Sequence, residues 1–85
     1  MKIVFSKHSL LKIELLKRHG LYLEKDFIEE VVSSPDMVEQ GYKNRLIAQK
    51  KLGKERVLRV VYEEHPGQIL IITLYPGRRQ RYEKD

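Results

Sequence analysis

The sequence predicts an α+β domain in which two N-terminal helices pack on an antiparallel sheet of about four strands. Apolar residues recur at helical spacing before Pro35 and at strand spacing after it. The strand-like segments are joined by short turns, which is typical of an antiparallel meander. A chain of 85 residues is long enough for one modest core, so residues 1–85 are expected to form a single domain.

Both predicted helices lie in the first half of the chain. Residues 3–5 are apolar and could form an edge strand, and Ser6 after them is a good N-cap. The first helix is predicted over Lys7–Arg18, with apolar side chains at positions 10, 11, 13, 15 and 16, and Gly20 ends it. A second helix is predicted over about residues 24–33, because apolar residues recur there in the same way.

The second half of the chain reads as strands. They are predicted over residues 37–42, 45–51, 56–63 and 68–75, with turns at 53–55 and 65–67. Both faces of the last strand are apolar, so we expect it to lie inside the sheet. Strict alternation along this strand predicts that Leu70, Ile72 and Leu74 share one face and that Ile69, Ile71, Thr73 and Tyr75 share the other.

The composition argues against several classes of function. There is no cysteine and there are three scattered histidines, so we predict no disulfide framework, no metal site and no bound cofactor. Neither a glycine-rich phosphate loop nor a nucleophile elbow occurs. No apolar run approaches the roughly 18 residues of a membrane span. We therefore expect a cytoplasmic protein with no membrane partner.

Charge is distributed unevenly along the chain. Residues 1–41 carry six Lys/Arg and seven Asp/Glu, whereas residues 42–85 carry eleven and five. The basic half carries the cluster Arg78-Arg79-Gln80-Arg81-Tyr82-Glu83 near its end. Such asymmetry favours a surface that faces a polyanion, most plausibly nucleic acid, although incidental clustering would give the same count.

RNA cleavage is a reaction that Arg, His and Tyr can support without a metal. The RNA 2′-hydroxyl is an internal nucleophile, so an enzyme needs to align it, move protons and stabilise the charged phosphorus centre. The predicted catalytic residues are His8, Arg79 and Tyr82. Four further arginines are predicted to hold RNA phosphates: Arg45, Arg59, Arg78 and Arg81.

Three of these residues have structural alternatives. Arg59 lies between two valines and could be a solvated side chain on the open face of the sheet or one half of a buried ion pair. His8, in the first turn of a helix, could be kept neutral and act as a base, or could be a capping or packing residue. Tyr82 could equally belong to a solvated basic tail.

Several stretches together resemble the BrnT-type toxins of the RelE-like superfamily and a related small family of uncharacterised domains. The resemblance is carried, in this order, by Phe5, Arg18-His19-Gly20, residues 29–36, residues 45–48, residues 56–64, the run that ends at Tyr75, and residues 78–83. It implies two helices packed on an antiparallel sheet, metal-independent mRNA cleavage, and inhibition by a cognate antitoxin. His8 departs from the BrnT pattern and looks like the histidine of the uncharacterised relatives.

The leading functional prediction is thus an endoribonuclease toxin whose partners are RNA and an antitoxin protein. Two alternatives stay open: a non-catalytic RNA- or ribosome-binding module that uses the same basic surface, and a protein-interaction domain. The ribosome and a second copy of the chain also stay open as partners.

Overall fold

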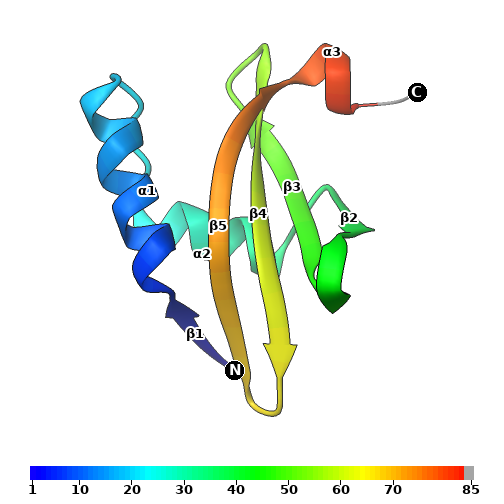
Figure 1. Cartoon of the computed structure of the whole chain (residues 1–85). Coiled ribbons are helices and arrows are strands. Elements are labelled where there is room, and N and C mark those ends of the chain that lie inside the picture. Colours follow the sequence, from blue (N-terminus) through cyan, green and yellow to red (C-terminus); the bar gives the residue numbers. More distant parts are fainter. Residues whose placement is uncertain (84–85) are drawn as a thin grey trace.

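A computed structural model describes residues 1–83 (Figure 1). The elements follow in the order β1 (Lys2–Phe5), α1 (Lys7–Arg18), α2 (Lys25–Ser33), β2 (Met37–Gln40), the short 3₁₀ helix η1 (Tyr42–Asn44), β3 (Leu46–Leu52), β4 (Arg56–His65), β5 (Gln68–Arg78) and α3 (Arg79–Tyr82). The α+β class and both N-terminal helices are therefore confirmed.

The sheet differs from the prediction in its number of strands and in their direction. It has five strands in the order β1-β5-β4-β3-β2. The strands β2 to β5 form the predicted antiparallel meander, but β1 adds to the free edge of β5 in parallel, with Ile3 opposite Ile69. A parallel neighbour needs a long crossover, and here the helices and the meander supply it. The prediction that β5 lies inside the sheet is confirmed.

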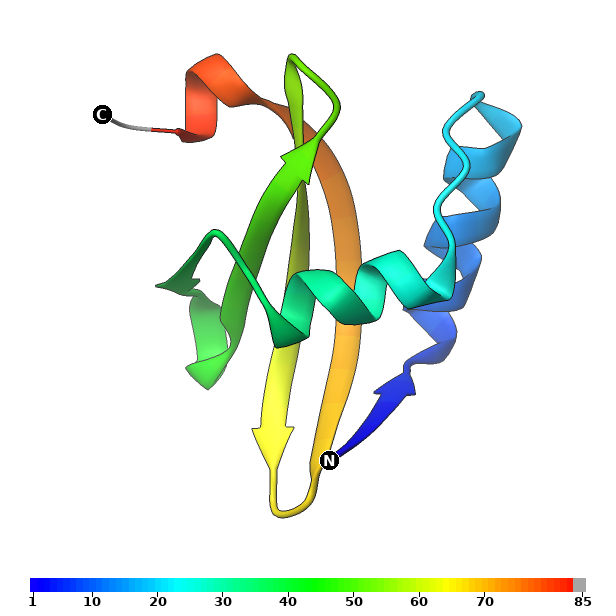
Figure 2. The same ribbon diagram turned by 180° about the vertical axis from the view of Figure 1, so that it is seen from behind.

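The helices α1 and α2 cover one face of the sheet, with α2 lying across the strands in Figure 2. The buried residues Ile28 and Val31 of α2 belong to one hydrophobic core with residues of β3, β4 and β5, while Ile13 and Leu16 of α1 pack at the margin of this core. The buried members of the cluster are Leu23, Ile28, Val31, Val32, Ala48, Leu58, Val60, Tyr62, Ile69, Ile71 and Leu74.

A β-bulge in β5 overturns the predicted alternation along that strand. Val61 of β4 lies opposite Thr73, but the next residue, Tyr62, lies opposite Ile71, so Ile72 is the extra residue. As a result Ile69, Ile71 and Leu74 all enter the helix-covered core, whereas strict alternation separates Leu74 from the other two.

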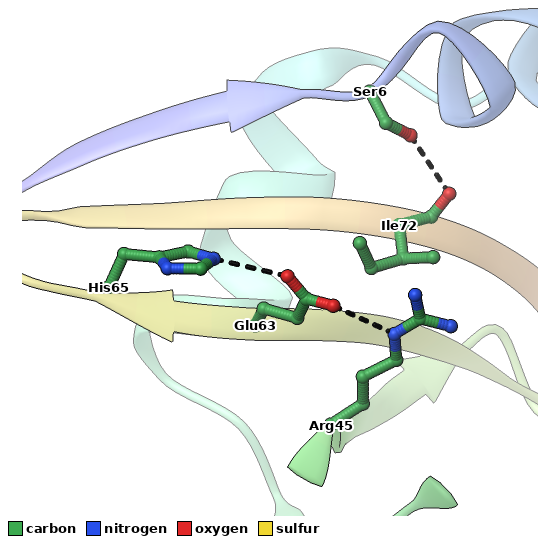
Figure 3. Close-up of polar contacts among 5 residues, drawn as sticks. All are labelled: Ser6, Arg45, Glu63, His65 and Ile72. Atoms are coloured by element: carbon green, nitrogen blue, oxygen red, sulfur yellow. Dashed lines mark hydrogen bonds and ion pairs between the residues drawn. The ribbon is translucent and has the colours of Figure 1, made fainter. Parts of the chain in front are cut away.

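Ser6 anchors the start of α1 at the bulge. Its hydroxyl accepts a hydrogen bond from the Ser9 backbone N–H at 3.0 Å, as predicted for an N-cap, and donates one to the Ile72 carbonyl at 2.9 Å (Figure 3). The backbone N–H of Ser6 also donates to the Ile71 carbonyl at 3.0 Å. The residue that caps the helix thus satisfies the carbonyl of the bulged residue.

The basic C-terminal cluster has secondary structure of its own. Residues 79–82 form the short helix α3, which the sequence did not predict. It contacts β4 and β5 and lies away from α1 in both views (Figures 1 and 2). Within residues 1–83, no helix is long and apolar enough to cross a membrane.

Candidate nucleic-acid interface

Arg59 occupies the middle of the sheet face that the helices leave open. It is only 4% exposed, because polar groups from three other strands surround its guanidinium. Nε donates to the Tyr75 hydroxyl at 3.0 Å, and Nη1 donates to Gln49 Oε1 at 2.5 Å. Nη2 forms an ion pair with the carboxylate of Glu39. Of the two structural alternatives for Arg59, the buried ion pair is the one observed.

The contacts of Arg59 also decide its protonation. Burial alone would lower the pKa of this guanidinium, but the hydrogen bonds to Glu39 and Tyr75 outweigh it and leave the pKa raised. Arg59 therefore carries its charge inside the sheet at every physiological pH. Each of its three nitrogens already donates to a protein acceptor and the side chain is buried, so a phosphate could reach it only if neighbouring groups move.

Tyr82 folds back from α3 onto the same face and covers Arg59. The centroid of its ring lies 4.3 Å from Arg59 Cζ, which is a cation–π contact. The ring sits on Gly77, where an added Cβ would come within 2.6 Å of Tyr82 Cδ2. Val57, opposite Gly77 on β4, is completely buried although it is no member of the core under the helices. A second, smaller packed cluster therefore holds α3 against the sheet.

Next to this cluster, the end of the sheet carries a shallow basic hollow of about 880 Å³. Arg56 of β4 and Arg78 of β5 are directly opposite each other in the strand register and are both exposed. Two cations at this spacing can contact one phosphate group together. The hollow is lined by Lys54, Glu55, Arg56, Arg78, Arg79, Gln80 and Glu83.

Arg79 is partly occupied by protein groups. Its Nε donates to Glu83 Oε1 at 2.7 Å, and its Nη1 donates to the Lys54 carbonyl at 2.8 Å. The Arg79 backbone N–H donates to the Glu55 carbonyl at 2.9 Å. Arg79 therefore ties α3 to the β3–β4 turn and keeps the wall of the hollow in place.

Arg45 belongs to a separate polar group, shown in Figure 3. Its Nε donates to Glu63 Oε2 at 2.9 Å, and His65 Nε2 lies 3.1 Å from Glu63 Oε1. Glu63 is seven residues from Arg56 along β4, which corresponds to about 23 Å. Arg45 and the basic hollow are thus at opposite ends of the strand and cannot hold the same phosphate.

We expect the contribution of Glu63 to stability to depend on pH. The hydrogen bond from Arg45, and secondly that from His65, hold the pKa of Glu63 below its usual range. A group whose pKa is lower in the folded state stabilises the fold above its unfolded pKa, and this contribution is lost as the pH falls through the folded pKa. Glu63→Gln should therefore lower the melting temperature at pH 7, and the difference from wild type should shrink between pH 5 and pH 3.

The matched control is Glu64→Gln, which neutralises the exposed carboxylate next along β4; among the described residues it makes no ion pair. Its melting temperature should follow that of wild type throughout. A Glu63→Gln difference that stays constant from pH 7 to pH 3 would contradict the role given to this carboxylate.

The structure unites only part of the predicted site. Arg59 and Tyr82 are in contact, and Arg78 and Arg79 both line the hollow. Arg81 is exposed on α3, with Cζ 5.6 Å from the centroid of the Tyr82 ring. His8 is exposed on α1, which packs on the covered face of the sheet, so it does not join the residues around α3.

The sequence reasoning missed Lys54 and Arg56. Lys54 lies within the predicted turn at 53–55 and Arg56 follows it, but the position of Arg56 opposite Arg78 depends on the bulge at Ile72. A regular hairpin folded at residues 65–67 would pair Arg56 with Gly77, and the extra residue moves Arg78 into that position. Nothing in the periodicity of the sequence reveals this shift.

Among residues 1–83 there is no group of three or more side chains that could hold a metal ion. Comparisons with protein-family models, with curated proteins and with solved structures find no match to this chain.

Proposed function

We propose that this protein is a RelE/BrnT-like toxin component of a type II toxin–antitoxin system, a metal-independent endoribonuclease that binds mRNA at the basic hollow. The observation that carries the proposal is the pair Arg56 and Arg78, exposed and opposite each other beside Lys54. Backbone phosphates supply most of the affinity of nucleic-acid complexes, and exposed arginines bind them with two donors each. The similarity of motif order to the BrnT-type toxins supports the same class and a RelE-like fold.

In this proposal, the residues of the hollow divide into those that bind phosphate and those that transfer protons. Lys54, Arg56 and Arg78 hold the phosphate, and Arg81 contacts a neighbouring one. The 2′-oxygen attacks phosphorus as its proton passes to a carboxylate at the hollow, Glu55 or Glu83. The bond from phosphorus to the 5′-oxygen breaks, leaving a cyclic 2′,3′-phosphate and a 5′-hydroxyl.

Tyr82 donates a proton to the leaving 5′-oxygen in this proposal, and Arg79 stabilises the charged phosphorus centre. Arg59 acts in this scheme as a positioning residue, since it fixes the Tyr82 ring from beneath. His8 has no role in it because α1 lies away from α3 in both views (Figures 1 and 2).

We expect Arg56→Ala/Arg78→Ala to weaken binding of single-stranded RNA by at least about tenfold at low salt. Each lost phosphate contact also removes about 0.7 from the slope of log affinity against log salt concentration, so the slope should become shallower by about 1.4. Fluorescence anisotropy with a labelled oligoribonucleotide, titrated at several salt concentrations, measures both quantities.

The matched control is Lys7→Ala/Arg18→Ala, which removes the same charge from exposed positions on α1. Its affinity for RNA and its salt slope should stay close to those of wild type. Equal losses in the two double variants would mean that net charge alone attracts RNA, and the hollow would then not be the binding site.

Cleavage is tested separately, by incubating RNA with the pure protein, with and without ribosomes. Wild type should give products ending in cyclic phosphate, whereas Arg79→Ala and Tyr82→Phe should bind RNA but cleave it far more slowly. Salt-sensitive binding without products from any RNA would instead favour the alternative, a non-catalytic RNA- or ribosome-binding module.

The proposed class also implies partners and location. A cognate antitoxin protein would inhibit the toxin in the cytoplasm, where its mRNA substrate is found. Co-expression with the product of a neighbouring short gene should relieve growth inhibition if that gene encodes the antitoxin.

A further inference from the structure

The helix α1 is apolar on two opposite sides. Ile13 and Leu16 face inward and pack against the core, and Ser9 is completely buried. Leu11 and Leu15 lie four residues apart on the outward side and are 63% and 48% exposed. A surface helix ordinarily has one apolar stripe facing the core and a polar face toward solvent. The second stripe on the solvent-exposed face of α1 departs from this pattern.

The position of α1 leaves this outer stripe accessible. The helix stands at the margin of the sheet next to β1 and β5, and α2 runs away from it across the strands (Figures 1 and 2). The neighbouring Leu10 is 39% exposed as well. Leu11 and Leu15 thus form the outer apolar stripe, and Glu14 separates Leu10 from it on the helix surface.

The charges on α1 indicate what kind of partner fits this surface. The helix carries Lys7, Lys12, Lys17 and Arg18 against a single carboxylate, that of Glu14. A second copy of the chain would bring together two such sets of four cations, which disfavours self-association. A partner with carboxylates beside an apolar stripe would satisfy both features at once.

We propose that the outer face of α1 is a docking site for an amphipathic helix with acidic flanks, supplied by another protein. Apolar side chains of the partner, at helical spacing, pack against Leu11 and Leu15, while its carboxylates pair with Lys7, Lys12 and Arg18. This site is on α1, which lies away from α3 and the basic hollow in both views (Figures 1 and 2), so the protein can bind its partner whether or not the hollow binds RNA.

The probe for the test is a designed helical peptide of about 18 residues with leucines at i, i+4 and i+7 and glutamates on both flanks. A second peptide keeps the leucines and has lysines in place of the glutamates. Fluorescence anisotropy should show wild type binding the glutamate peptide at least about tenfold more tightly than the lysine peptide.

The variant Leu11→Gln/Leu15→Gln removes the stripe with residues that suit a helix. Because both leucines are exposed, the melting temperature should stay near that of wild type, while affinity for the glutamate peptide falls about 10- to 100-fold. The matched control, Met37→Gln/Val38→Gln, alters two exposed apolar residues of β2 and should bind like wild type.

Four results would overturn the proposal. The first is that the two peptides bind equally well or not at all, and the second is that the β2 control loses as much affinity as the α1 variant. The third is a wild-type dimer in light scattering that Leu11→Gln/Leu15→Gln dissociates, because a second copy would then cover the face. The fourth is leucine-dependent binding to phosphatidylglycerol vesicles without peptide binding.

Discussion

Arg59→Met is expected to lower the free energy of unfolding by about 2–4 kcal/mol. The substitution keeps a long side chain but removes the N–H groups from which Gln49, Tyr75 and Glu39 accept hydrogen bonds. Gln49 is 1% exposed, so its side-chain oxygen would be left without a partner inside the sheet. The cation–π contact with Tyr82 would be lost as well. Urea denaturation followed by circular dichroism measures the change.

The control for Arg59→Met is Glu39→Gln, because Glu39 has an accessible side chain that is 46% exposed. Glutamine keeps an oxygen that can accept the hydrogen bond from Arg59 Nη2, so this variant should cost less than Arg59→Met. The pair of variants separates structure from function. If Arg59→Met were as stable as wild type but bound RNA more weakly, Arg59 would be a phosphate ligand and not a structural centre.

Gly77→Val is expected to cost about 1–3 kcal/mol, the usual penalty of overpacking. Valine favours strands, and Gly77 lies within β5, so local propensity predicts a gain in stability. The tertiary contact reverses the sign, because the new Cβ would meet Cδ2 of the Tyr82 ring at 2.6 Å. The ring must then leave Gly77, which uncovers Arg59. Loss of proton NMR contacts between the Tyr82 ring and the Arg59 side chain would report the displacement.

A double-mutant cycle tests whether the ring causes this cost. Tyr82→Ala removes the obstacle, so adding Gly77→Val to that background should change the free energy of unfolding by much less than it does in wild type. An equal cost in both backgrounds would contradict the packing of Tyr82 on Gly77.

The local elements were predictable because their signals lie within a few residues. Ser6 caps α1 as expected, and α1 has the bounds that the apolar spacing predicted. The three strands that follow η1 also lie close to their predicted positions. In each case, side chains near in sequence fix the backbone, through a cap, a turn or a period.

The sheet order and the site needed contacts between distant residues. The segment 3–5 was expected as an edge strand, but its parallel pairing with β5 joins residues more than 60 positions apart. The sequence around Arg59 is compatible both with a solvated side chain and with a buried ion pair. Only the contacts with Glu39, Gln49 and Tyr75, which come from other strands, distinguish the two.

The basic cluster near the C-terminus also combines features set by the local sequence with features set by contacts between distant residues. The sequence by itself determined that the second half of the chain is basic, that two helices precede a meander, and that a tyrosine closes the cluster. Only the tertiary structure decided which cations face solvent: the bulge at Ile72 shifts β5 by one residue, which sets Arg78 opposite Arg56 and Gly77 beneath Tyr82. Charge and periodicity are properties of the chain, whereas register and burial exist only once the strands pair.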